Sequence, residues 1–79
     1  MFRKLVKTAE IVIDGQPYEL QYFEEQSIRG VRRFNCEVRL SAADRIILDD
    51  DSMPSLESRV ARLAPATVYS RLLAARQAA

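Results

Sequence analysis

The strongest chemical signal in this 79-residue sequence is the run Asp49–Asp51, with Glu57 one or two helical turns further on. Carboxylate oxygens are the ligands that Mg²⁺ and Ca²⁺ prefer, so the run is a candidate cation site. Its spacing does not match a calcium loop, which needs alternating acidic residues, a glycine and a distal glutamate. Consecutive side chains at a strand end also point in different directions, so few of them could converge. We therefore expect these aspartates to end a strand and start a helix, and we predict no metal site.

Cys36 is the only cysteine, and the chain has no histidine. An intramolecular disulfide is therefore impossible, and a zinc site built from thiolates and imidazoles is excluded. A catalytic thiol needs a base to activate it, and no imidazole can do so. The two glycines, Gly15 and Gly30, cannot form a phosphate-cradling loop. We predict no catalytic residue, no cofactor-binding residue and no enzyme activity.

Arginine is the other residue type that could bind a ligand, because its guanidinium can hold a phosphate in a bidentate fork. Six arginines are candidate nucleic-acid contacts: Arg32, Arg33, Arg59, Arg62, Arg71 and Arg76. Twelve Lys and Arg against eleven Asp and Glu leave a net charge of +1, which weakens the phosphate attraction that dominates such binding. A helix-turn-helix centred on Pro65 fits poorly, since its turn lacks the usual glycine.

Two alternating segments, separated by Asp14-Gly15, predict a β-hairpin. Loops of two or four residues both keep the apolar faces aligned, and Pro17 favours the longer loop because it has no N–H to donate. The inward set is then Ala9, Ile11, Ile13, Tyr18, Leu20 and Tyr22. Residues 1–7 are expected to be a frayed lead into the first strand, with a basic arm that orders on a nucleic acid or membrane as the alternative. Residues 24–30 are expected to form a polar connection after the hairpin.

The segment 33–40 alternates most regularly, which predicts a strand with Cys36 facing the core. Its apolar set is Phe34, Cys36, Val38 and Leu40, and the intervening Arg33, Asn35, Glu37 and Arg39 are assigned to water. A short fourth strand is expected over 45–48. The sheet as a whole is predicted within residues 8–48.

The segment 52–77 has helical periodicity, with Ser52 as N-cap and Pro54 in the first turn. Its apolar stripe consists of Met53, Leu56, Val60, Leu63 or Ala64, Val68, Leu72 and Ala75. Pro65 interrupts this pattern and favours two helices, about 53–63 and 65–77, over one kinked helix.

These elements predict one α+β domain over 1–79, an antiparallel sheet of three or four strands with the helical region packed on one face. The chain is 48% hydrophobic and 29% charged, and no run of about 18 apolar residues or leader-like segment is present. We therefore expect a small cytoplasmic protein without a membrane partner.

The function that this pattern favours is a non-enzymatic interaction or assembly module, whose partner is another protein or, in weak self-association, a second copy. Apolar residues that the strand and helix patterns leave outside the core mark the predicted surface: Val12, Phe23, Ile47, Tyr69 and Leu73. The alternative is a small RNA- or DNA-binding protein, which requires the arginines to share one continuous face.

Overall fold

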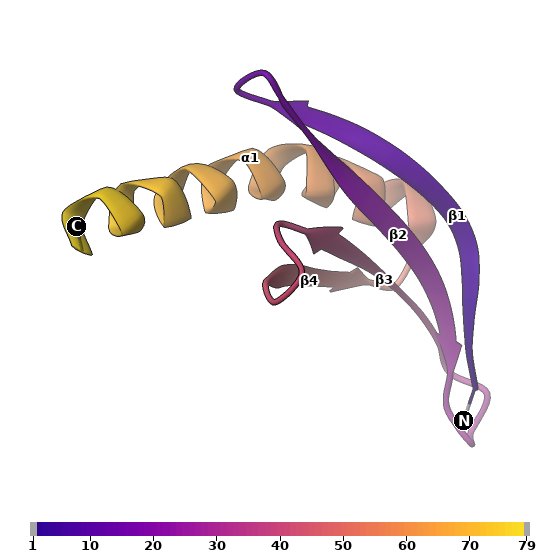
Figure 1. Ribbon diagram of the computed structural model, residues 1–79. Helices are drawn as coiled ribbons and strands as arrows, with labels where there is room; N and C mark the ends of the chain where they lie inside the picture. The colour runs from indigo at the N-terminus through magenta and orange to yellow at the C-terminus, as the bar shows by residue number, and fades with distance from the viewer. Residues whose placement is uncertain (1, 79) are drawn as a thin grey trace.

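The structure, a computed structural model that describes residues 2–78, consists of four antiparallel strands followed by one long helix (Figure 1). The strands follow one another across the sheet in the order β1-β2-β3-β4. Their bounds are β1 Phe2–Ile13, β2 Gln16–Gln26, β3 Arg32–Arg39 and β4 Arg45–Asp50, and helix α1 covers Met53–Ala78. The predicted α+β class, with an antiparallel sheet before a C-terminal helical region, is confirmed.

The first hairpin turns through two residues, Asp14 and Gly15, with φ angles of 52° and 79°. The expected four-residue loop is therefore wrong, because Pro17 lies in β2 and pairs with Val12. In a two-residue hairpin the closing pair is hydrogen-bonded and the next pair is not, so Pro17 has no need to donate to β1. The pairing of β2 with β3 begins only at Leu20, which leaves Pro17 outside that ladder as well.

The β1–β2 hairpin is longer than the pattern predicted at its open end. β1 begins at Phe2, which pairs with Gln26, so residues 2–7 are part of the strand and form neither a frayed lead nor an arm. β2 likewise continues through the first part of the expected connection at 24–30. An irregularity in β1 between Leu5 and Lys7 shifts the register by one residue. Such a bulge changes which face later side chains occupy, and it lets Lys7 reach the helix.

Helix α1 is a single element of 26 residues, so the preferred two-helix interpretation is wrong and its single-helix alternative holds. Ser52 caps it as predicted, since its Oγ accepts a hydrogen bond from the Ser55 N–H at 3.3 Å. Pro65 removes the donor for the Ala61 carbonyl. Ala61 is exposed, so water can satisfy that carbonyl and the helix continues.

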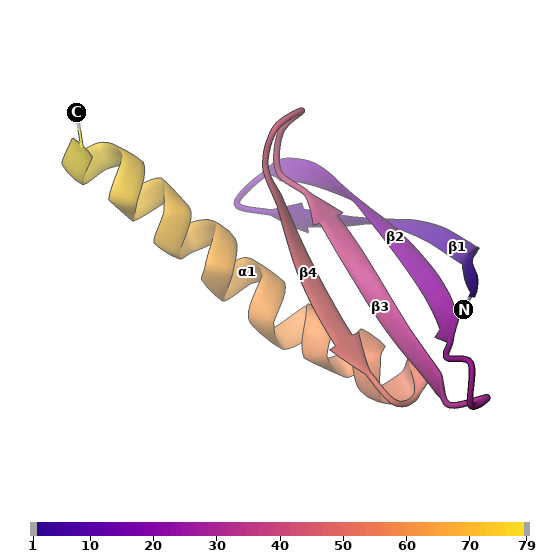
Figure 2. The same cartoon turned by 90° about the horizontal axis from the view of Figure 1, so that it is seen from below.

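One face of the sheet packs against α1 and forms the core, mainly through β3 and β4 (Figures 1 and 2). Complete burial of a leucine contributes about 1.5–3 kcal/mol, so a core this small depends on each member. Strands β2, β3 and β4 supply the sheet side of this core from their predicted inward sets. In β1, Ile11 and Ile13 are only partly buried and Ala9 is exposed, contrary to prediction. The buried apolar residues are Leu20, Tyr22, Cys36, Val38, Ile46, Leu56, Val60, Ala64 and Val68.

The helix is longer than the strands that it covers. At 1.5 Å per residue α1 extends about 39 Å, whereas the 6 residues of β4 extend about 20 Å. Figure 2 accordingly shows the C-terminal half of α1 projecting past the sheet. Leu72 and Ala75, expected in the buried stripe, are exposed, because no strand lies beneath them.

Cys36 should react with a thiol reagent only after unfolding. It has no exposed surface, and burial raises the pKa of its thiol to about 11, so little reactive thiolate exists at neutral pH. Labelling with a chromogenic disulfide should be slow in buffer and rapid in denaturant. Rapid labelling of the native protein would place Cys36 outside the core.

Replacement of Ser52 by alanine should lower the free energy of unfolding by about 1 kcal/mol, because the first turn loses its side-chain acceptor. Urea denaturation of both proteins measures the difference. Ser52→Asp, which retains an acceptor, should recover most of the loss. Equal stability of the alanine variant and the parent would contradict the capping role.

Candidate functional site

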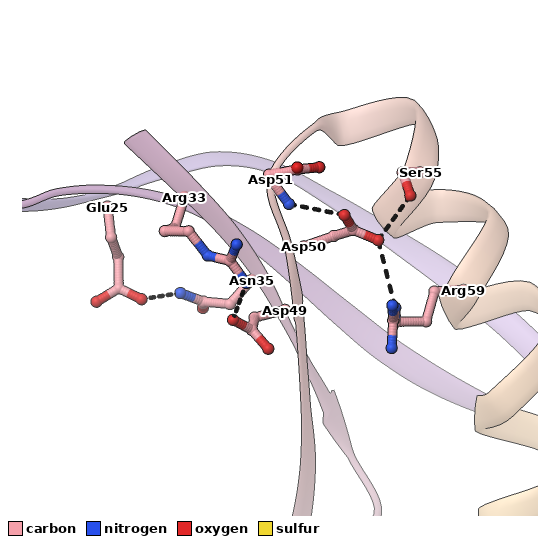
Figure 3. Close-up of polar contacts among 8 residues, drawn as sticks. All are labelled: Glu25, Arg33, Asn35, Asp49, Asp50, Asp51, Ser55 and Arg59. Carbon is pink, nitrogen blue, oxygen red and sulfur yellow. Dashed lines mark hydrogen bonds and ion pairs between the residues drawn. The ribbon is translucent and has the colours of Figure 1, made fainter. Parts of the chain in front are cut away.

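The aspartate run joins β4 to the helix start through Asp50 (Figure 3). Its Oδ2 accepts hydrogen bonds from the Ser55 hydroxyl at 2.6 Å and from Arg59 Nε at 3.3 Å. Its Oδ1 accepts the Asp51 N–H at 2.7 Å. These contacts, the Ser55 hydroxyl first, hold the pKa of Asp50 below its ordinary value of 3.8. The carboxylate therefore ties the last strand to the first turns of α1.

The three aspartates separate in the way that the alternation of a strand requires. Asp49 lies on the other side of β4, where its Oδ2 is 2.6 Å from Arg33 Nη2. Asp51 is exposed in the turn before the helix. Within residues 2–78, no group of three or more His, Cys, Asp or Glu side chains is arranged to hold a metal ion.

The sheet face opposite α1, here called the open face, carries a buried polar network. Glu37 is only 6% exposed at its side chain and lies 3.3 Å from Arg3 and 3.1 Å from Arg45. Asn35, also buried, donates to Glu25 and accepts from Arg3 at 3.3 Å. The assignment of Asn35 and Glu37 to water is therefore wrong. They face away from the helix, but long neighbouring side chains cover them.

This network surrounds a shallow hollow of about 570 Å³ on the open face. Two residues of the predicted interaction surface, Phe23 and Ile47, line it. Phe23 is half-buried, contrary to the prediction of exposure, because the Arg3 guanidinium lies 3.7 Å above its ring. Val12 is exposed on the same face, near the hairpin turn, and does not line the hollow.

The other two predicted surface residues, Tyr69 and Leu73, lie on the part of α1 that projects past the sheet. Tyr69 is 62% exposed, Leu73 38% and Leu72 between them 44%. Their spacing of i, i+3 and i+4 places the three on one side of the helix. We call these three residues the projecting surface. The structure thus separates the five predicted residues into two groups, on opposite layers of the molecule.

A hollow of about 170 Å³ lies beside the projecting surface, where the helix leaves the sheet. Leu72 and Val68 line it from the helix, Tyr18 from β2, and Leu40 from the residue just after β3. Arg71 lies at its rim and binds Asp44. An apolar side chain from outside could enter this hollow and extend the contact begun on the projecting surface.

The six candidate arginines do not form one continuous face, because Arg33 meets Asp49 on the open face whereas four of the others lie on α1. Four are bound to carboxylates: Arg32 to Glu24, Arg33 to Asp49, Arg59 to Asp50 and Arg71 to Asp44. In the described part of the chain Arg62 and Arg76 have no ion-pair partner, and both are exposed. Each lies seven residues from Tyr69 in the sequence, so they border the projecting surface at its two ends.

No protein-family model, curated protein or solved structure matches the chain. Over residues 2–78, α1 is the only helix, and it is not apolar enough to cross a membrane.

Several residues of these sites were missed in the sequence. Leu72 belonged to the expected core stripe, and only the overhang of α1 makes it a surface residue. Arg3 was assigned to the lead into the first strand, and Glu37 to a solvated strand face. The alternation of 33–40 identified the face of Glu37 correctly, but no local signal indicated that Arg3 and Arg45 would cover it.

Replacement of Asp50 by asparagine should reduce the dependence of stability on acid pH. The pKa of Asp50 is lower in the folded state, so its stabilisation is complete above its ordinary value of 3.8 and declines as the pH falls below it. Urea unfolding between pH 2 and pH 7 measures this. The parent should lose more stability than Asp50→Asn on acidification, whereas parallel curves would contradict the role of Asp50.

Proposed function

We propose that this protein is a non-enzymatic interaction module that binds an acidic, amphipathic helical segment of another protein. The observation that carries the proposal is the projecting surface of α1, in which Tyr69, Leu72 and Leu73 are exposed on one side of the helix. It lies between two arginines that have no ion-pair partner among the described residues. An apolar stripe at i, i+3 and i+4 is the pattern by which one helix receives another.

The shape of the molecule supports the use of this overhang. The radius of gyration is 13.9 Å, compared with about 11.6 Å for a compact chain of this length. The accessible surface is 5514 Å², roughly 650 Å² more than proteins of this mass normally expose. A standard interface buries about 800 Å² on each partner. The overhang contributes to this excess, together with the β1–β2 hairpin, whose strands are longer than β3 and β4.

Charge indicates which kind of partner fits. Residues 58–79 contain four arginines and no acidic residue. Two of these, Arg59 and Arg71, are neutralised by Asp50 and Asp44, which leaves Arg62 and Arg76 for a partner. Glutamates or aspartates along the edges of a partner helix would meet these two charges.

The same charges disfavour a second copy as the occupant. In a parallel pair of α1 helices, Arg62 would lie near its own counterpart, and in an antiparallel pair it would lie near Arg76. No acidic side chain of that segment could offset the repulsion. Like charges across an interface suppress a wrong partner. We therefore place an acidic protein segment before self-association.

A synthetic amphipathic helix, with leucines on one face and glutamates along both edges, tests the proposal by fluorescence anisotropy. It should bind the parent, and Leu73→Glu should weaken binding about tenfold or more, because a charge then enters the apolar contact. Ala74→Glu is the matched control, since it adds the same charge at an exposed neighbour outside the stripe. Its affinity should stay close to that of the parent.

The charge requirement is tested with the double variant Arg62→Glu, Arg76→Glu. It should lose the glutamate peptide and gain a peptide in which lysines replace the glutamates. Equal losses in Leu73→Glu and Ala74→Glu would overturn the proposed surface. Self-association of the parent across a hundredfold dilution, abolished by Leu73→Glu, would replace the acidic partner with a second copy.

A further inference from the structure

Two arginines stand directly opposite one another at the end of the β3–β4 hairpin. Arg39 and Arg45 are Cα partners in the antiparallel ladder, and both occupy the open face. Side chains in such pairs lie close together, and like charges in them are destabilising. The arrangement therefore needs a compensating negative charge.

The protein provides that compensation for one arginine only. Arg45 Nη1 lies 3.1 Å from Glu37 Oε1. Arg39 is exposed and has no ion-pair partner among the residues that the structure describes. The remaining N–H groups of Arg45 and the whole fork of Arg39 are thus open to a ligand.

Two hollows meet at this pair. Arg39 and Arg45 line the hollow of about 570 Å³ on the open face and also a second one of about 250 Å³ at the β3–β4 loop. Gln21 and Asn35 contribute amide groups to the first hollow, and Ser41 contributes a hydroxyl to the second. The pair is therefore accessible and has further hydrogen-bond donors around it.

The carboxylates nearby are already engaged. Glu37 is held by Arg3 and Arg45, and its side chain is only 6% exposed. Glu25 accepts a hydrogen bond from Asn35, and Asp44 is paired with Arg71. The charge that these hollows leave uncompensated is that of Arg39.

We infer that Arg39 and Arg45 form a binding site for a phosphate-type oxyanion, either free phosphate or a phosphomonoester. A tetrahedral dianion can accept hydrogen bonds from two guanidinium groups at once, and it relieves the repulsion between them. Arg39 and Arg45 lie on the sheet face opposite α1, so an oxyanion bound between them does not occupy the projecting surface. A phosphomonoester would place its organic part in the larger hollow, beside Phe23 and Ile47.

Titration with inorganic phosphate and with O-phosphoserine, at constant ionic strength and followed by arginine side-chain NMR, tests the inference. Saturable shifts should appear at Arg39 and Arg45. Arg39→Gln should weaken binding about fivefold or more, because it removes one charged fork. This variant should fold normally, since Arg39 has no ion-pair partner to lose within residues 2–78. Arg29→Gln is the matched control: Arg29 is also exposed, in the turn at the opposite end of β3.

The two ligands distinguish the source of the phosphate. Tighter binding of O-phosphoserine would assign the site to a phosphomonoester, and equal binding would assign it to free phosphate. Equal weakening by Arg39→Gln and Arg29→Gln would show only general charge attraction and would overturn the inference. Absence of saturation with either ligand would overturn it as well.

Discussion

The packing of four apolar side chains of α1 against the β3–β4 half of the sheet is the contact on which the rest of the structure depends. Leu56, Val60, Ala64 and Val68 recur every four residues and are almost fully buried. This contact fixes the position of α1. The length of α1 is set by its own sequence, which continues as a helix beyond the contact. Since α1 is much longer than β4, the same contact that builds the core also forces the C-terminal half of the helix beyond the sheet.

Within residues 2–78, the open face of the sheet has no helix packed on it, and the polar side chains Asn35 and Glu37 are buried there by neighbouring side chains. No apolar layer covers that face in the described structure, and Glu37 nevertheless loses most of its contact with water. A buried carboxylate is tolerated only when cations and hydrogen bonds compensate it, and Arg3 and Arg45 supply them from the two outer strands. Arg3 also lies over the Phe23 ring, so a single side chain joins the polar network to an apolar surface.

The distribution of charge favours a different kind of ligand on each of the two layers. On the helix, every acidic residue lies in the first two turns, and the segment after Glu57 carries arginine alone. The projecting surface therefore combines apolar area with positive edges, which supports the proposed acidic protein partner. On the sheet, Glu37 is already satisfied, and the uncompensated Arg39 lies beside Arg45. This supports the binding of a small anion on the sheet face opposite α1.

The sequence by itself determined the fold class, the inward faces of the strands, the burial of Cys36 and the cap at Ser52, because each follows from local periodicity or from a single turn of backbone. The local patterns around Pro17 and Pro65 gave wrong predictions. Pro17 lies at a strand position that donates no hydrogen bond to its neighbours, and the carbonyl that Pro65 leaves without a donor is exposed to water. Tertiary structure alone decided the rest. The exposure of Leu72 follows from the difference in length between helix and sheet, and the burial of Glu37 follows from Arg3 and Arg45 meeting it across strands far apart in the chain. Neither is a property of the residue's own neighbours in sequence, so periodicity could not reveal it.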